Sequence, residues 1–152
     1  MKRIIRICLL WGVFINMVQA GDASNECKTF HIQVSNLTQH ACVLISHRVF
    51  RGNLITPPPL SILSGDTKRF DMRQTVYGPT ILLSFQCGPE SISFISKQNA
   101  CFLEAGSVTG ELLPPLPINL NATYTALPGS YFWEKSGSIN WKIIDLKTFS
   151  DS

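Results

Sequence analysis

Three histidines are the residues of this chain best suited to acid–base or nucleophilic chemistry: His31, His40 and His47. A histidine that meets a serine and a carboxylate in space forms the catalytic group of a serine hydrolase. The short nucleophile motif G-x-S-x-G is absent. The nearest match is Gly106-Ser107-Val108-Thr109-Gly110, whose serine lies one position early. A small hydrolase with a histidine-based site drawn from distant strands is therefore kept as an alternative, and a non-enzymatic protein is favoured.

Carboxylates and metal ligands give weaker signals. Asp66, Asp71, Glu104 and Glu111 could supply the paired carboxylates of a glycosidase, but solvated surface charge is the preferred interpretation of all four. The chain has no Gly-rich phosphate loop and no calcium loop. His40-Ala41-Cys42 lacks the further ligands that would complete a tetrahedral zinc site. The sequence therefore predicts no catalytic residues, no cofactor and no metal.

An aromatic run is the most suggestive binding motif: Gly129-Ser130-Tyr131-Phe132-Trp133-Glu134. Side chains alternate between the two faces of a strand, so three adjacent rings cannot all face one core. An exposed aromatic beside polar groups is a common platform for a sugar ring or a lipid interface. We predict Tyr131, Phe132 and Trp133 as ligand-binding residues. The alternative is that the rings serve two layers or lie buried under a loop.

The first 20 residues have the three parts of a secretory signal peptide. They are a basic head of Lys2, Arg3 and Arg6, an almost entirely apolar Ile7 to Met17, and Val18-Gln19-Ala20 at the exit. We expect residues 1–20 to be removed and residues 21–152 to form one secreted or periplasmic domain.

Removal of this segment changes the charge of the protein. The full chain has 13 basic and 10 acidic residues, a net charge of +3, and three of the basic residues lie in the head of the signal. The mature domain is therefore neutral and lacks the basic footprint of a nucleic-acid binder. No later segment has the roughly 20 apolar residues that a transmembrane helix needs.

Four cysteines remain in the mature chain: Cys27, Cys42, Cys87 and Cys101. An even number in an exported domain predicts two disulfides, and three pairings are possible. A hairpin through 36–39 would place Cys42 opposite about residue 34. The strand near 91–96 would hold Cys87 and Cys101 too far apart for a bond. The bridges are expected to join more distant parts of the chain.

Apolar and polar residues alternate with a period of two along most of the mature chain, which predicts strands with one buried face. Frequent Gly, Pro, Asn and Asp turns separate these runs. The pattern predicts an all-β, antiparallel sandwich. Its eight strands are expected near 28–35, 41–49, 67–73, 80–87, 91–96, 101–109, 121–126 and 138–145. Leu112 to Leu120 contains three prolines and is expected to be an exposed connection.

Several short motifs lie along the mature chain. They are Asn36-Leu37-Thr38 before Cys42, Tyr77-Gly78-Pro79, Phe85-Gln86-Cys87-Gly88, Gln98-Asn99-Ala100-Cys101-Phe102, Ala105-Gly106, and the aromatic run before Gly137-Ser138-Ile139-Asn140-Trp141. Together they resemble small, uncharacterised exported proteins of intracellular gammaproteobacteria. That resemblance implies a bacterial source and offers no catalytic residues. A looser likeness, in size, β content and aromatic richness, is to the aegerolysins, β-sandwiches that bind membrane lipids. The four cysteines depart from the aegerolysin pattern.

These features predict a secreted, non-enzymatic binding module for a surface glycan, lipid or protein. Its expected site is the aromatic run. The small hydrolase is one alternative. The other is an inhibitor or interaction factor that presents the connection Leu112 to Leu120 to a partner protein.

Overall fold

The computed structural model describes residues 26–101 and 106–146, and these residues contain ten strands. In chain order they are β1 (Thr29–Asn36), β2 (Cys42–Arg51), β3 (Asn53–Leu54), β4 (Ser61–Ile62), β5 (Thr67–Arg73), β6 (Thr80–Cys87), β7 (Glu90–Gln98), β8 (Val108–Leu113), β9 (Leu120–Leu127) and β10 (Gly137–Asp145). The expected signal peptide, residues 1–20, lies outside the described residues.

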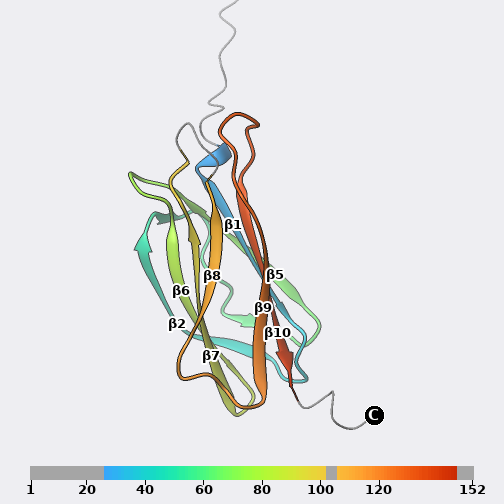
Figure 1. Ribbon diagram of the computed structural model, residues 1–152. Coiled ribbons are helices and arrows are strands. Elements are labelled where there is room, and N and C mark those ends of the chain that lie inside the picture. The colour runs from blue at the N-terminus through green and yellow to red at the C-terminus, as the bar shows by residue number, and fades with distance from the viewer. Residues whose placement is uncertain (1–25, 102–105, 147–152) are drawn as a thin grey trace, which may run out of the picture.

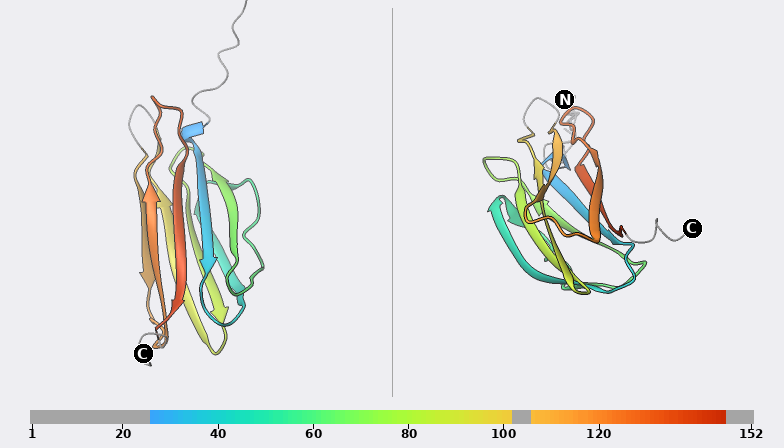
Figure 2. Two further views of the ribbon diagram at one scale, coloured as in Figure 1. Left: turned by 90° about the vertical axis from the view of Figure 1, so that its right-hand side faces the viewer. Right: turned by 60° about the horizontal axis from the view of Figure 1, so that its bottom comes forward.

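The strands form two five-stranded sheets packed face to face (Figures 1 and 2). One sheet has the order β3-β5-β1-β10-β9, and the other has the order β4-β2-β6-β7-β8. The predicted all-β sandwich is confirmed. One pair departs from the antiparallel prediction, because β1 and β10 are parallel neighbours with Phe30 opposite Gly137. Periodicity reports which face of a strand is buried and carries no information on the direction of its neighbour.

The core contains the apolar residues that alternate along β1, β5, β6, β7 and β10. Phe30, Ile32 and Val34 of β1 are fully buried, and so is Trp141 of β10. The Trp141 ring stacks on Phe94 of the opposite sheet with the ring centroids 4.3 Å apart. Period-two alternation therefore places these side chains between the sheets, as the sequence predicts.

The strand expected at 101–109 is wrong. Strand β8 begins only at Val108, and Cys101 lies in the connection that precedes it. The Asn99 N–H donates to the Ser107 carbonyl at 2.8 Å and closes this connection into a loop. The Cys101 N–H donates to the Gln74 side-chain oxygen at 2.7 Å. The Asn99–Ser107 bond adjoins the Gln98–Val108 pair, at which the β7–β8 ladder ends.

Both expected disulfides are present, as Cys27–Cys101 and Cys42–Cys87. They join residues 74 and 45 positions apart, as expected. The hairpin predicted through 36–39 is wrong, because β1 and β2 belong to different sheets. The buried Asn36 side chain fixes this crossing by donating to the His40 carbonyl at 2.7 Å and the Ile62 carbonyl at 2.9 Å.

No helix in the described segments is long and apolar enough to cross a membrane.

Candidate functional site

The connection between β9 and β10 is a tight loop closed by its own backbone. Ser130 and Lys135 bond to each other in both directions, with N···O distances of 2.8 and 3.0 Å. The Trp133 N–H donates to the Ser130 hydroxyl at 3.2 Å. Glu134 has φ = 48°, in the left-handed region that non-glycine residues rarely adopt outside turns. Tyr131, Phe132, Trp133 and Glu134 therefore form the tip of this loop.

Two of the three aromatic residues predicted to bind a ligand are exposed to solvent at that tip. Phe132 is 71% exposed and Trp133 is 77% exposed, whereas Tyr131 is half-buried. The Tyr131 and Phe132 rings meet edge to face, with their centroids 5.8 Å apart. Phe132 and Trp133 are therefore not core residues, which removes the alternative of burial under a loop.

The base of the loop is anchored to the first disulfide. Gly129 and Gly106 exchange two backbone hydrogen bonds of 3.0 Å, which joins the loop to the end of the β7–β8 connection. A Cβ atom at Gly129 would lie 3.3 Å from the Cys27 sulfur, so backbone and disulfide are in close contact. The aromatic tip thus rises from a cross-linked base at the end of the sandwich where β1 begins (Figure 1).

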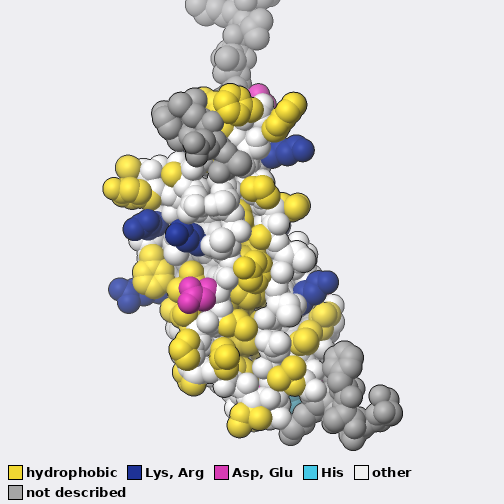
Figure 3. Space-filling view, in the orientation of Figure 1, with side chains coloured by type: hydrophobic (Ala, Val, Ile, Leu, Met, Phe, Trp, Pro, Cys, Tyr) yellow, Lys and Arg dark blue, Asp and Glu magenta, His cyan; other side chains and the backbone are white. Residues whose placement is uncertain are grey.

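A second apolar connection lies at this end of the molecule, between β5 and β6. Val76 is 78% exposed and Tyr77 is 62% exposed. The following Gly78 packs against the backbone of Gln98 and Asn99, where any side chain would collide with the Gln98 carbonyl. This contact holds the Val76–Tyr77 connection against the end of β7. Figure 3 shows hydrophobic side chains at both connections on this face.

A histidine–carboxylate pair lies on the outer face of the first sheet. His31 Nδ1 lies 2.8 Å from Asp71 Oδ1 and 2.6 Å from the Arg69 Nη2 nitrogen. Arg69 also donates to Asp71 through its Nε, at 2.9 Å. Partial burial raises the pKa of Asp71, but the hydrogen bonds and charges of Arg69 and His31 outweigh it, so the pKa lies below its ordinary value of 3.8.

This pair lacks the further parts of a hydrolase site. Ser138 is the neighbour of His31 on β10, yet no hydrogen bond among the described residues joins them. Arg69 beside Nδ1 competes with Asp71 for the nitrogen through which a triad carboxylate orients its base. His31, Arg69 and Asp71 lie together on the outer face of the sheet, so their geometry fits a surface ion-pair cluster.

The other candidates for chemistry are dispersed. His40 and His47 are exposed on separate segments. Asp66 pairs with Lys68, and Glu111 is exposed on β8. Glu104 lies outside the described residues. Within the described ranges, no three or more His, Cys, Asp or Glu side chains gather as a metal site.

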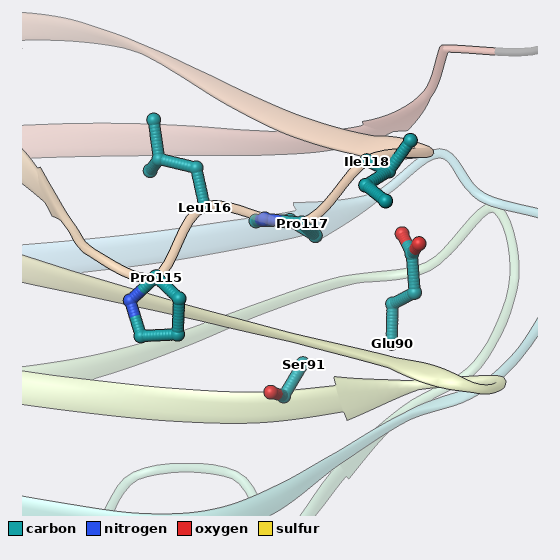
Figure 4. Close-up of a pocket in the computed structure, with 6 residues that line it drawn as sticks. All are labelled: Glu90, Ser91, Pro115, Leu116, Pro117 and Ile118. Atoms are coloured by element: carbon teal, nitrogen blue, oxygen red, sulfur yellow. The ribbon is translucent and has the colours of Figure 1, made fainter.

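The opposite end of the sandwich carries the proline-rich connection between β8 and β9. Asn119 donates to both oxygens of the Glu90 carboxylate, at 2.9 and 2.8 Å, and ties the connection to the start of β7. A shallow pocket of about 190 Å³ lies between them (Figure 4). Leu116 and Ile118 on the pocket rim are 60% and 84% exposed. This geometry supports the expected exposed connection for residues 114–119, whereas Leu112 and Leu113 belong to β8.

No protein-family model matches the chain, and no curated protein matches its sequence. The fold is similar to that of IP-1A from Alcaligenes faecalis, with a TM-score of 0.56 and 11% identity over 80% of this chain and 94% of the other. It is also similar to the lipid binding protein Nakanori, with a TM-score of 0.53 and 11% identity over 76% of this chain and 70% of the other. At this identity the likeness concerns the fold alone.

The comparisons bear differently on the two resemblances drawn from the sequence. The likeness to small lipid-binding β-sandwiches is supported at the level of the fold. The resemblance to exported gammaproteobacterial proteins stays a prediction.

Sequence reasoning missed the second apolar connection. Tyr77-Gly78-Pro79 predicts a turn, and Val76 has no predicted role. The available signal was a β-branched residue and a tyrosine directly before that turn, where polar residues are usual. Their position beside the β9–β10 loop depends on the sheet order, which the sequence does not contain.

Proposed function

We propose that this protein is an exported, non-enzymatic binding module that attaches to a lipid surface through its β9–β10 loop. The observation that carries this proposal is the adjacent exposure of Phe132 and Trp133 at a loop tip. Tryptophan prefers the boundary between water and hydrocarbon, where its apolar ring and its polar N–H are both satisfied, and the apolar Phe132 ring is stabilised by leaving water. Nakanori, which has a similar fold, is a lipid binding protein, in keeping with this assignment.

The energetics favour the loop tip as an anchor. Removing an aromatic or large aliphatic side chain completely from water is worth about 1.5–3 kcal/mol. Two adjacent rings on one rigid turn can enter an interface together, without the cost of ordering a flexible loop first. The backbone bonds of Ser130 and the disulfide beneath Gly129 supply that rigidity.

Export is the second part of the proposal. The basic head, apolar stretch and Val18-Gln19-Ala20 exit favour secretion and cleavage after residue 20. Two disulfides are typical of proteins that function in oxidising compartments. A lipid or glycan on the outside of a membrane is therefore within reach of the mature domain.

Tryptophan fluorescence offers a direct test with the oxidised mature domain. Its two tryptophans are Trp133, which is exposed, and Trp141, which is fully buried. Phosphatidylcholine vesicles, with and without phosphatidylserine, should shift the Trp133 emission to shorter wavelength. Vesicle flotation should fall about tenfold or more for Trp133→Ala, since one ring leaves the interface.

Leu60→Ala provides a matched control, because Leu60 is as exposed as Trp133 but lies on another connection. It should float like the parent protein. Unchanged flotation of Trp133→Ala, or an unshifted Trp133 emission of the parent protein on vesicles, would reject the loop as the anchor. Binding of a soluble glycan that depends on Trp133, without vesicle binding, would show that the loop binds a sugar instead.

The proline-rich connection favours a second candidate function, the presentation of a loop to a partner protein. Leu116 and Ile118 are exposed, while Asn119 and Glu90 hold the loop in one shape. Leu116→Ser with Ile118→Ser should abolish binding to such a partner and leave vesicle flotation intact. The reverse pattern would exclude this candidate.

A further inference from the structure

Three cations gather on the outer face of the second sheet, close to the two apolar connections. Arg51 of β2 and Lys97 of β7 both flank Thr80 of β6, so they stand in one row across three strands. Thr80 directly follows the Val76–Tyr77 connection. Arg48 lies on β2 toward the middle of the sheet, in register with Leu82. All three cationic side chains are exposed.

Two of these cations are held by aromatic rings. The Arg51 guanidinium lies 5.0 Å from the centroid of Tyr77, and the Arg48 guanidinium lies 5.0 Å from the centroid of Phe50. A guanidinium stacked on a ring is restrained in position, yet the N–H groups in its plane stay free to donate. A guanidinium restrained in this way can donate two parallel N–H hydrogen bonds to the oxygens of a phosphate group.

The cations at this end lack anionic partners. No salt bridge among the described residues reaches any of the following: Lys28, Arg48, Arg51, Arg73, Lys97 and Lys135. Arg73 lies at the end of β5 opposite Thr29, and Lys135 lies in the aromatic loop itself. Within the described ranges no ion pair takes up the charge of these cations, so their N–H groups are available to a ligand.

The described charges are distributed unevenly along the sandwich. These six cations and Arg69 share their half of the sandwich with four described carboxylates, Glu26, Asp71, Glu111 and Glu134, of which Asp71 is paired with Arg69 and His31. The far half carries Asp66, Glu90 and Asp145 with Lys68 and Lys142. Figure 3 shows Lys and Arg side chains below the two apolar connections and none at the lower end of that face. The mature domain is neutral as a whole, so the two ends of the sandwich differ in where the charged side chains lie and the net charge does not cause the difference.

We propose that this end of the sandwich recognises anionic phospholipid in a membrane surface, with Arg51, Lys97 and Lys135 contacting headgroup phosphates while Phe132 and Trp133 enter the interface. The proposal rests on the function proposed above and adds the charge class of the lipid. Each cation near an anionic membrane surface contributes about 1 kcal/mol, which is about a fivefold change in binding constant. Cations and aromatic anchors at the same end of the sandwich combine both sources of affinity.

The experiment compares the same substitution, lysine to glutamine, at the two ends of the sandwich. The oxidised mature domain is floated with phosphatidylcholine vesicles and with vesicles of three parts phosphatidylcholine to one part phosphatidylserine. Lys97→Gln should weaken binding to the anionic vesicles about fivefold, and Arg51→Gln with Lys97→Gln about 25-fold. Lys142→Gln, the same change at an exposed lysine on β10 toward the other end, should leave binding within about twofold.

Added salt should weaken the anionic binding of the parent protein more than that of the double variant. Equal weakening by Lys97→Gln and Lys142→Gln would reduce the effect to net charge and overturn the proposal. Binding that is the same with and without phosphatidylserine would overturn it as well, but would leave the lipid function standing. Binding of a soluble sulfated glycan without any vesicle binding would assign the cations to a glycan and reject both.

Trp133→Ala separates the two proposals. If it leaves anionic binding intact while Lys97→Gln weakens it, the aromatic anchor is wrong and the charge recognition holds. Thermal unfolding of every variant, monitored by the near-ultraviolet signal of buried Trp141, confirms that the fold is retained.

Discussion

The Trp141 Nε1–H donates a hydrogen bond of 2.8 Å to the Ser96 hydroxyl in the interior of the sandwich. Trp141 belongs to β10 and Ser96 to β7, so this bond joins the two sheets. Both residues are fully buried. A polar contact in this position fixes how one sheet lies on the other, because a buried donor without a partner is costly.

Ser96→Ala tests this link. The substitution leaves the buried indole N–H without its acceptor, and we expect the free energy of unfolding to fall by about 1–3 kcal/mol. Chemical denaturation of the oxidised domain measures the change. Ser91→Ala, at an exposed position of the same strand, should change stability by less than about 0.5 kcal/mol. Equal effects of the two substitutions would show that the bond contributes nothing specific.

Gly110→Ala examines the apolar side of the same tryptophan. A Cβ atom at Gly110 of β8 would lie 2.5 Å from Trp141 Cζ2 and 2.9 Å from Ile139 Cδ1. Overpacking of this kind typically costs about 1–3 kcal/mol, and we expect a loss of stability in that range. Thr109→Ala on the outer face of the same strand is the control. A stable Gly110→Ala protein would mean that the sheets can separate at this edge without penalty.

Much of this architecture follows from the sequence, for a physical reason. Alternating residues such as Phe30, Ile32 and Val34 must share one face of a strand, and that face must be buried. The buried Ser96 could not be assigned in this way, because a serine is polar and its partner Trp141 lies 45 positions away. The parallel β1–β10 pair was equally beyond reach, since strand order depends on contacts between distant segments.

The residues of the candidate site also fall into those that the sequence predicts and those that only the structure brings together. Tyr131, Phe132 and Trp133 are neighbours in the chain, so alternation alone indicated that one ring must turn outward. Arg51 and Lys97 stand in one row only because β2 and β7 both pair with β6. That register requires the structure, and a shift of one residue would send either side chain to the other face.

The two disulfides should differ in function although both stabilise the fold. Replacing either pair by alanines, Cys27 with Cys101 or Cys42 with Cys87, should lower the free energy of unfolding by about 2–4 kcal/mol. Only the Cys27–Cys101 bridge lies beneath the aromatic loop, next to Gly129. Hydrogen exchange at the Ser130 and Lys135 amides should therefore accelerate in the first double variant alone. Equal acceleration in both would indicate global loosening of the sandwich.

Acid should weaken the cluster around Asp71. Its pKa is lowered in the folded protein, so the ionised carboxylate stabilises the fold above the ordinary value of 3.8, and this contribution disappears as the pH falls through the lower folded value. Asp71→Asn removes the titrating group. The difference in unfolding free energy between parent and variant should be largest near neutral pH and shrink in acid below that ordinary value. Arg69→Gln deletes the donor that reaches Asp71 Oδ1 at 2.9 Å and should reduce the pH dependence of this difference. A difference that stays constant from neutral pH into acid would show that Asp71 acts through its shape and not its charge.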